Sequence, residues 1–458
     1  MAFTRFASLR VIPLALLFST PAHATLYTVG TGGTHASIQD AIDAAVHSAG
    51  DDEIRIHVDT YDEHVLVPNT LTGQLTISGG WGNGFLTKVR NGAASTIISP
   101  TTEGTGVTLK PAAGAHVVLA DLTISNAKAT NCAGFRIEAN GTSTVAIEDS
   151  FVLDNDMSTS AGTARGGGGC VLAKDSAAVT VSGTTVQGNK ARVTGLNGNA
   201  EGGGLAIDCY NDSHCDIVDT LILQNRLEAA NNAADGAGLY LDAQDASVVT
   251  VKRSVFSGQE IGGAPNPALG LSVHVVASAL AQVEIAQSLF LGGGATPASA
   301  VEAELFAWPG GAAQVLVDND VFAHSVGAAL QTRAYADSQV TLMQLTLADN
   351  GAPSFVDAFG TVPPLVYDNI FAGGAAEITI GSGATAEHNL LVDDPGFVAS
   401  SLDDFSLRGG NSPAVNAGST TRDVGLYDVS GAPRVQDDVV DIGAYESSDR
   451  VFAARFDP

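Results

Sequence analysis

Acidic side chains recur at matching positions in several short segments whose apolar residues alternate with other residues. These segments span residues 134–138, 204–208, 238–242 and 270–274, and each begins with glycine. Alternation with a period of two is typical of half-buried strands, so the residues between the apolar ones should face outward. The outward positions form one column of Glu138, Asp208, Asp242 and His274 and a second column of Arg136, Ala206, Tyr240 and Ser272.

The two aspartates of the first column suggest a chemistry. If neighbouring strands lie about 4.8 Å apart, Asp208 and Asp242 stack as like charges, which raises the pKa of one carboxyl or recruits a cation. Carboxylates at this separation suit a calcium ion, or the base of a β-elimination on uronic acids. We therefore take Asp208, Asp242 and His274 as candidate catalytic residues, and Asp208 with Asp242 as a candidate calcium site.

Long loops leave the repeating segments at one corner and should form a wall beside these columns. They comprise residues 156–166, 190–201, 226–235 and 260–268. A wall beside a polar strand face has the geometry of a saccharide groove, with Arg136, Glu138 and Tyr240 on its ligand-binding surface. The alternative is a solvated wall, because a chain with a formal net charge of −28 carries acidic residues at many outward positions.

These candidate residues belong to a repeat that must position them. One apolar position recurs every 20 to 36 residues, at Val152, Val186, Ile222, Phe256, Phe290, Phe322, Leu347, Phe371 and Leu391. Each repeat is too thin to bury its own apolar face, whereas a stack of repeats buries a continuous core. Asparagines at the ends of several repeats are explained by turns with stacked side chains, without a binding role.

The repeat predicts an all-β fold, a single right-handed parallel β-helix over residues 53–395. The right hand follows from the crossover rule for parallel strands. Residues 25–52 should form an N-terminal cap, in which a helix over 37–46 covers the exposed strand edges. Residues 396–446 should close the other end of the stack, and 447–458 should form a tail.

The first 24 residues have the features of a secretory signal peptide. Arg5 and Arg10 precede or flank a short apolar run over 11–18, and Ala22-His23-Ala24 is a cleavage site of the usual kind. The sequence contains no other apolar segment long enough to span a membrane. The net charge of −28 argues against nucleic acid and anionic membranes as partners. We expect an exported protein, secreted or at the cell surface, and a monomer.

Export permits disulfide bonds among the four cysteines. Cys209 and Cys215 flank a short polar turn, so we expect them to be bonded. Cys132 lies three residues before its own strand, whereas Cys170 takes a position within one. An offset of about 10 Å along the strand exceeds the reach of a disulfide, so these two should be buried or free thiols.

Two parts of the chain resemble known families. Residues 27–33, 53–58 and 61–65, with the helix between them, look like the start of β-helices of the pectin-esterase type. The run Asn411-Ser-Pro-Ala-Val-Asn-Ala-Gly418, with 423–425, Arg434 and Asp441-Ile-Gly-Ala-Tyr-Glu446, resembles the choice-of-anchor Q domain. The resemblance implies an exported bacterial β-helix protein of the pectin-lyase-like superfamily. The characteristic motifs of polygalacturonases, pectin esterases and pectate lyases are missing from this sequence, which lowers the odds of those activities.

Three functions are compatible with these observations. The first is a surface or matrix protein without catalytic activity that binds a polysaccharide or cell-surface glycan through its lateral wall. The second is a lyase or hydrolase that acts on an acidic polysaccharide with the Asp208 and Asp242 region. The third is a structural spacer. Missing enzyme motifs favour the first over the second, while the scarcity of aromatic residues on the columns keeps the third open.

Overall fold

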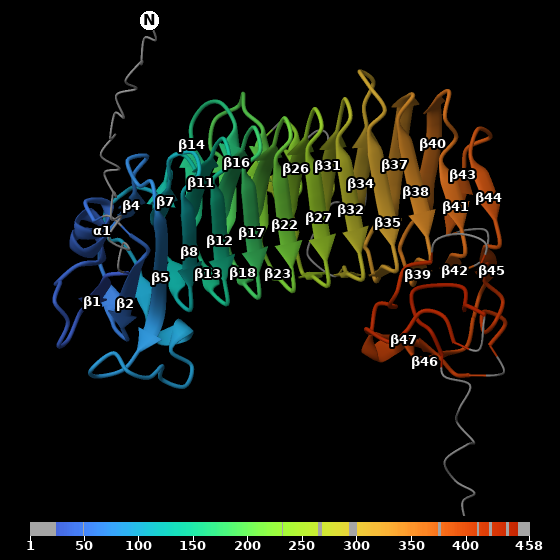
Figure 1. Cartoon of the computed structure of the whole chain (residues 1–458). Coiled ribbons are helices and arrows are strands. Elements are labelled where there is room, and N and C mark those ends of the chain that lie inside the picture. The colour runs from blue at the N-terminus through green and yellow to red at the C-terminus, as the bar shows by residue number, and fades with distance from the viewer. Residues whose placement is uncertain are drawn as a thin grey trace, which may run out of the picture.

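The chain forms a right-handed parallel β-helix. The computed structural model describes residues 24–447, except for 49, 231, 264–267, 293–299, 374–376, 410–411, 421–423 and 437–438. Within these residues, short strands stack coil upon coil into an elongated solenoid (Figure 1). The fold class predicted from the repeat is confirmed. The expected signal peptide and tail lie almost entirely outside the described residues.

Three long parallel sheets, here called A, B and C, form the faces of the solenoid. Each complete coil contributes one strand to each sheet, and the first and last coils are incomplete. Sheet A contains β1 (Leu26–Val29), β2 (Asp52–His57), β5 (Gln74–Trp81), β8 (His116–Ala120), β12 (Thr144–Glu148), β17 (Ala178–Ser182), β22 (His214–Val218), β27 (Val248–Lys252), β32 (Gln282–Ala286), β35 (Gln314–Asp318), β38 (Gln339–Met343), β41 (Leu365–Tyr367) and β44 (Thr385–Glu387). Sheet B contains β3 (Thr60–Tyr61), β6 (Ile97–Ile98), β9 (Thr123–Ser125), β13 (Phe151–Leu153), β18 (Thr185–Gln187), β23 (Leu221–Leu223), β28 (Val255–Ser257), β33 (Leu289–Leu291), β36 (Val321–Ala323), β39 (Thr346–Ala348), β42 (Ile370–Ala372) and β45 (Leu390–Val392). Sheet C contains β4 (Val65–Val67), β7 (Val107–Leu109), β11 (Phe135–Ala139), β16 (Gly169–Ala173), β21 (Leu205–Cys209), β26 (Leu239–Ala243), β31 (Val273–Ala277), β34 (Val301–Ala307), β37 (Ala328–Ala336), β40 (Ser354–Gly360) and β43 (Ile378–Ile380).

The inward side chains of these sheets fill one continuous apolar core. The recurring position read from the sequence is in register along sheet B from Val152 to Leu391, as predicted. Phe256, Phe290 and Phe322 stack there with ring centroids 4.8 and 4.5 Å apart. Leu391 on the last coil is 44% exposed.

Helix α1 (Ile38–Val46) packs over the first strands of the stack. Its buried face consists of Ile38, Ala41, Ile42 and Ala45. Ser37 caps the helix, since its side chain accepts a hydrogen bond from the backbone N–H of Asp40 at 3.1 Å. The carboxylate of Glu63 accepts from the N–H groups of Ile38 and Gln39 at 2.9 and 3.0 Å. The helix predicted from the apolar spacing is therefore present and fixed at its N-terminal end.

The long loops contain two further parallel sheets, which make a two-layered wall between sheets B and C. Sheet D contains β10 (Lys128–Ala129), β14 (Asp156–Thr159), β19 (Lys190–Val193), β24 (Arg226–Ala229) and β29 (Glu260–Gly263). Sheet E contains β15 (Ala164–Arg165), β20 (Ala200–Glu201), β25 (Ala234–Asp235) and β30 (Ala268–Leu269). A small second core, which includes Met157, Ala164, Ala191 and Leu227, lies between the two layers. The residues of sheets D and E that alternate with the core residues face away from this core. Those of sheet D therefore lie on one side of the wall and those of sheet E on the other.

A buried ladder of amide side chains joins successive coils where sheet B meets the wall. The Nδ2 group of Asn155 donates to Oδ1 of Asn189 at 2.9 Å, and Nδ2 of Asn189 donates to Oδ1 of Asn225 at 3.0 Å. Gln259 continues the ladder, because its Oε1 accepts from the N–H of Asn225 at 2.9 Å. The structural explanation of the asparagine column is confirmed.

The C-terminal segment folds back along the side of the solenoid. It includes the antiparallel pair β46 (Phe397–Ala399) and β47 (Asp404–Leu407), and it lies below β39, β42 and β45 in Figure 1. Its apolar residues cover outward side chains of sheet B, among them Val321, Ala348 and Ile370. We expected this segment to close the end of the stack. It packs against the side instead because the later strands of sheet B have apolar residues at outward positions.

Hydrogen bonds fasten this segment to well-separated coils. Gln287 Nε2 donates to the carbonyl of Tyr427 at 2.9 Å, and the N–H of Gly443 donates to the carbonyl of Asp368 at 2.9 Å. Within the segment, the fully buried guanidinium of Arg434 donates to the carbonyls of Asp441 and Gly443 at 2.8 and 2.6 Å.

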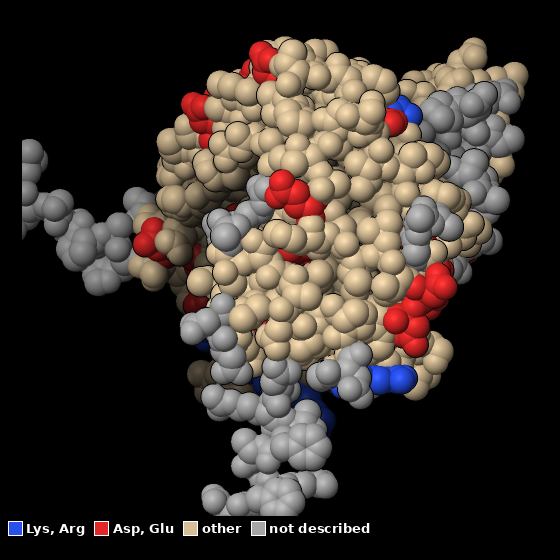
Figure 2. Space-filling view, turned by 90° about the vertical axis from the view of Figure 1, so that its right-hand side faces the viewer, with Lys and Arg blue, Asp and Glu red and all other residues tan. Residues whose placement is uncertain are grey.

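Figure 2 shows the molecule from the C-terminal end of the solenoid. Most of the described surface in this view is uncharged, and acidic residues lie in small separate groups.

The cysteine pairing is the reverse of the one we expected. Cys132 and Cys170 form a disulfide with their Cα atoms 5.5 Å apart, whereas Cys209 and Cys215 are free and buried. Cys132 adopts a left-handed backbone (φ 48°), so the chain turns there rather than extending away. Cys170 faces outward, since it is in register with Arg136. Cys209 and Cys215 fill inward positions of two sheets, in register with Ala243 and Val249 as predicted.

The described residues contain no helix with the length and hydropathy needed to cross a membrane.

Candidate functional site

The outward face of sheet C carries the predicted aspartates. Asp208 on β21 is directly opposite Asp242 on β26, and the intervening inward neighbours Ile207 and Leu241 are buried. The two residues therefore lie on adjacent coils with the same orientation, as predicted. A one-residue slip of register would have turned both carboxylates into the core.

His274 stands in a different column from the one we expected. It pairs with Tyr240, while Asp242 pairs with Val276. The reason is the glycine that precedes each strand: Gly270 has φ +59°, and its equivalent in the preceding coil is Gly236 with φ +69°, not Gly238. This alignment shifts the 270–274 segment by two residues, so Ser272 does not stand beside Tyr240.

Arg165, which the sequence analysis missed, neutralises Asp208 from the wall. Its Nη1 and Nη2 groups donate to Oδ2 and Oδ1 of Asp208, both at 2.7 Å, and its Nε lies 2.9 Å from Oε2 of Glu201. The guanidinium also lies over the ring of Tyr240, 5.2 Å from its centroid. Burial alone would lower the pKa of Arg165, but the two carboxylates raise it overall. A signal existed in the sequence, because Arg165, Glu201 and Asp235 each precede an equivalent glycine of the wall.

Asp242 is held by neutral donors. The hydroxyl of Tyr210 donates to its Oδ2 at 3.1 Å, and Nε2 of Gln244 lies 3.1 and 2.9 Å from its two oxygens. Burial raises the pKa of Asp242 despite these bonds. Burial also raises the pKa of Glu201, and it raises the pKa of Asp235 on the next coil of the wall to about 6.

His274 supports the site from below its surface. The imidazole is only 5% exposed and stacks on Tyr240 with ring centroids 5.6 Å apart and an interplanar angle of 14°. Its Nδ1 lies 3.4 Å from the fully buried carboxylate of Glu304. Phe306 makes an edge contact with the imidazole, with ring centroids 5.5 Å apart. This position allows His274 to orient Tyr240, and the ring offers little surface to a ligand.

Arg136, Glu138 and Asp208 meet at one small cavity of about 120 Å³, together with Arg165 and the Cys132–Cys170 disulfide. Glu138 pairs with Arg136 and with Lys110, whose Nζ lies 3.1 Å from its Oε1. We call the face that combines this cavity with the adjoining side chains the wall corner, made of Arg136, Glu138, Arg165, Glu201, Asp208, Asp235, Tyr240 and Asp242. The predicted wall residues are thus brought together on one surface.

Calcium at Asp208 and Asp242 stays a prediction. Among the described residues, no group of three or more His, Cys, Asp or Glu side chains is arranged to hold a metal ion. Arg165 supplies to Asp208 the positive charge that we had expected from a cation. A calcium ion here would need ligands from Asp242 and from the bound molecule itself.

One comparison with known proteins supports the fold. The family model of the right-handed β-helix region matches residues 87–274. A search among proteins of curated function found no match. The crystal structure of pectate lyase Pel9A is 13% identical, with 93% of this chain and 98% of that chain covered and a TM-score of 0.45.

Two other solved structures are similar at lower scores. Pectin methylesterase from carrot is 11% identical, with 81% of this chain and 89% of that chain covered and a TM-score of 0.34. A rhamnogalacturonan lyase is 11% identical, with 87% and 97% covered and a TM-score of 0.29. At these scores the likenesses carry no argument about function, and membership of the choice-of-anchor Q family stays a prediction.

Proposed function

We propose that this chain is an exported glycan-binding protein that holds a polysaccharide against the wall corner. The observation that carries the proposal is the cluster around Arg165, in which the guanidinium contacts Asp208 and Tyr240 of sheet C and Glu201 of sheet E. Rigid, partly buried polar groups suit the hydroxyl groups of sugars, whereas the ring of Tyr240 is already stacked between Arg165 and His274.

The charge of the wall corner indicates the kind of glycan. Five carboxyl groups, those of Glu138, Glu201, Asp208, Asp235 and Asp242, outnumber the two guanidinium groups of Arg136 and Arg165. A neutral glycan binds this surface directly, because its hydroxyls can donate to carboxylates. An acidic polysaccharide would need a bridging cation, and this is the role that we propose for calcium.

The test is glycan retention on an array, with and without calcium, by wild type and by the double variant Asp208→Asn with Asp242→Asn. We expect the double variant to lose at least about tenfold in affinity, which corresponds to about 1.4 kcal/mol. Asp219→Asn, on an exposed turn away from the wall, is the matched control and should bind as wild type does. If the double variant retains glycans as wild type does, the wall corner is excluded as the glycan-binding site. A role as a structural spacer would then be the better hypothesis.

A polysaccharide lyase or hydrolase is the second candidate. It is favoured by burial, which raises the pKa of Asp242 and raises the pKa of Asp235 to about 6, since a carboxyl with a raised pKa can serve as a general acid or base. Incubation with uronate polymers and measurement of unsaturated products and new reducing ends separates this candidate from binding alone. Product formation that is lost in Asp242→Asn would establish the enzyme.

A further inference from the structure

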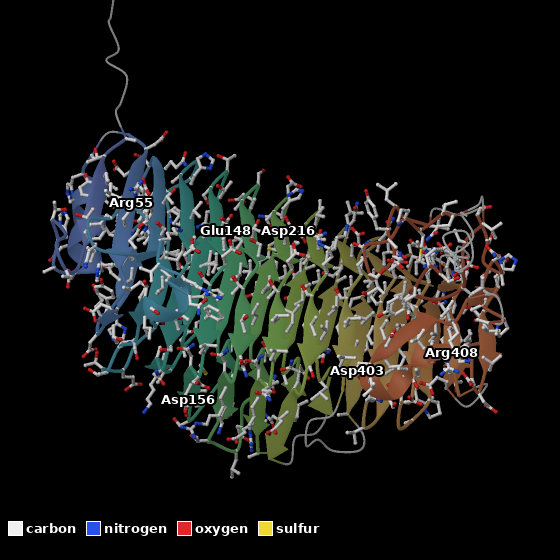
Figure 3. All side chains as sticks on the ribbon, turned by 90° about the horizontal axis from the view of Figure 1, so that it is seen from below. Arg55, Glu148, Asp156, Asp216, Asp403 and Arg408 are labelled. Atoms are coloured by element: carbon white, nitrogen blue, oxygen red, sulfur yellow. A yellow bond between two sulfur atoms is a disulfide. The ribbon has the colours of Figure 1, made fainter. Side chains whose placement is uncertain are left out.

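The opposite side of the wall contains a larger cleft. It has a volume of about 690 Å³ and lies where the turns after β6, β9 and β13 meet sheet D. In Figure 3, Asp156 lies on this flank of the solenoid, opposite to Glu148 and Asp216 on sheet A. The cleft is lined by Ser99, Pro100, Thr101, Thr102, Glu103, Asn126, Lys128, Ala129, Asp154, Asp156, Ser158 and Arg192.

The cleft exists because side-chain size changes along sheet D. In the later coils the outward positions carry long charged residues that pair across the strands: Lys190 lies 2.8 Å from Glu228, and Arg226 lies 3.1 Å from Glu260. In the first coils the corresponding surface carries short side chains such as Ser158, which is in register with Arg192 and, one coil further, Glu228. Space is therefore left over the first coils of sheet D, and this space is the cleft.

Several polar groups of the cleft are held in place by contacts outside it or along its edge. The N–H and hydroxyl of Thr101 both donate to Asp62 at 2.7 Å, and Thr102 is bonded to Nε2 of His64 at 3.0 Å. The guanidinium of Arg192 lies 3.0 Å from Oδ2 of Asp156 and donates to Oγ of Ser158 at 3.2 Å. These bonds fix the lining before any ligand arrives.

Other groups are left with bonding capacity. Oδ1 of Asp156 is buried and accepts no hydrogen bond within the described residues. Lys128 is exposed at the rim and has no ion pair among the described side chains. Glu103, Asp154 and Asp156 make the lining net negative, and it contains no aromatic side chain.

We propose that this cleft is a second saccharide site, specific for a neutral, hydroxyl-rich oligosaccharide. Such a ligand can accept from Lys128 at the rim and donate to carboxylates of the lining such as Glu103 and Asp154, and its lack of charge avoids repulsion by the three carboxylates. The volume is within the usual range of ligand sites, about 300–1,000 Å³. Since no residue that lines this cleft belongs to the wall corner, the inference does not depend on the proposed function.

The test uses a substitution whose side chain fills the cleft. Ser158→Trp should abolish retention of at least one neutral oligosaccharide on an array of neutral and uronate glycans, and Lys128→Ala should weaken its affinity at least about fivefold, roughly 1 kcal/mol. Glu228→Trp is the matched control, because Glu228 stands two coils further along the column of Ser158 and outside the cleft. Lys128 is exposed, so its variant keeps the fold even if the tryptophan does not.

The outcomes separate the two sites. A neutral glycan that Ser158→Trp and Lys128→Ala lose, while Glu228→Trp and the Asp208→Asn with Asp242→Asn double variant retain it, supports the proposal. It is overturned if no neutral glycan depends on Ser158 and Lys128, or if uronate oligomers bind the cleft more tightly than neutral ones. A glycan lost only in the double variant belongs to the wall corner.

Discussion

Two bidentate arginine–aspartate pairs differ in how far water reaches them. The side chains of Arg165 and Asp208 are 28% and 14% exposed, whereas those of Arg253 and Asp219 are 49% and 53% exposed. The bonding geometry is similar, with distances of 2.7 Å in the first pair and 2.7 and 2.9 Å in the second. The pairs therefore differ mainly in burial, although Arg165 also contacts Glu201 and the ring of Tyr240.

We expect Arg165→Ala to lower the free energy of unfolding by about 1–3 kcal/mol, because it leaves the Asp208 carboxylate partly buried without its partner. Arg253→Ala should cost at most about 1 kcal/mol, since water solvates Asp219 after the change. Urea unfolding of both variants checks the difference. Equal losses would mean that the wall corner is as well solvated as the outer surface.

The sequence was sufficient for some of these residues and not for others. Alternation in the strands placed Asp208 and Asp242 together because their apolar neighbours permit one orientation only. Arg165 and Glu201 come from short strands of the wall with a weak pattern, so their approach to sheet C could not be read locally. The disulfide was missed for a similar reason, because a single left-handed residue at Cys132 decides the direction of the chain.

At the scale of elements, the amide ladder holds adjacent coils at a fixed spacing. Asn189 lies at its centre and is fully buried. Its Oδ1 accepts from both the N–H and the Nδ2 of Asn155, at 3.0 and 2.9 Å, and its Nδ2 donates to the carbonyl of Val152 at 2.9 Å. Water cannot easily replace these hydrogen-bond partners, because the position is fully buried between coils.

Asn189→Ala should lower the free energy of unfolding by about 2–4 kcal/mol, because several buried donors and acceptors lose a partner at once. Asn140→Ala, on an exposed turn, should change it by less than about 0.5 kcal/mol. Chemical denaturation of the two variants measures this contrast. A small effect at Asn189 would show that the coils keep their spacing through the strand ladders alone.

Elements with a strong apolar pattern were predicted well, and elements with a weak one were not. The coils and α1 follow from large residues at regular spacing, such as Phe256 and Ile38. The wall strands are two to four residues long and pack small residues such as Ala164, Ala200 and Ala234, which carry little strand signal. The position of the C-terminal segment depends on outward residues of distant coils and is invisible in its own sequence.

At the scale of the whole molecule, several carboxyl groups are protonated more readily in the fold than in the unfolded chain. Burial raises the pKa of Glu302 from 4.5 to about 7 and also raises the pKa of Glu377 to about 7. Glu446 follows the same trend, with a pKa of about 8. These groups lie in different parts of the fold, so their effects on stability should be largely additive.

These raised pKa values determine whether stability rises or falls with pH. A raised carboxyl pKa contributes its full stability below about 4.5, and the contribution is lost as pH rises through about 7. For Glu302 alone the loss is on the order of 3 kcal/mol, from a shift of 4.5 to about 7. We therefore expect the Tm to fall as pH rises from about 4.5 to 8.

Glu302→Gln should reduce this slope, because glutamine has no proton to lose at the same buried position. Thermal melts of wild type and variant across this pH range provide the measurement. Asp219, whose pKa is lowered by Arg253, titrates below this range and makes Asp219→Asn a suitable control. A Tm that rises with pH in wild type would contradict the prediction.

The fold-back of the C-terminal segment changes how the solenoid loses its structure. A stack held only by contacts between neighbours can fray from its end one coil at a time. Here the bonds of Gln287 to Tyr427 and of Gly443 to Asp368 span several coils. Because these bonds join coils that are not neighbours, we expect the coils between Gln287 and Asp368 to unfold as one cooperative unit, and the wall coils before Gln287 to unfold independently of it.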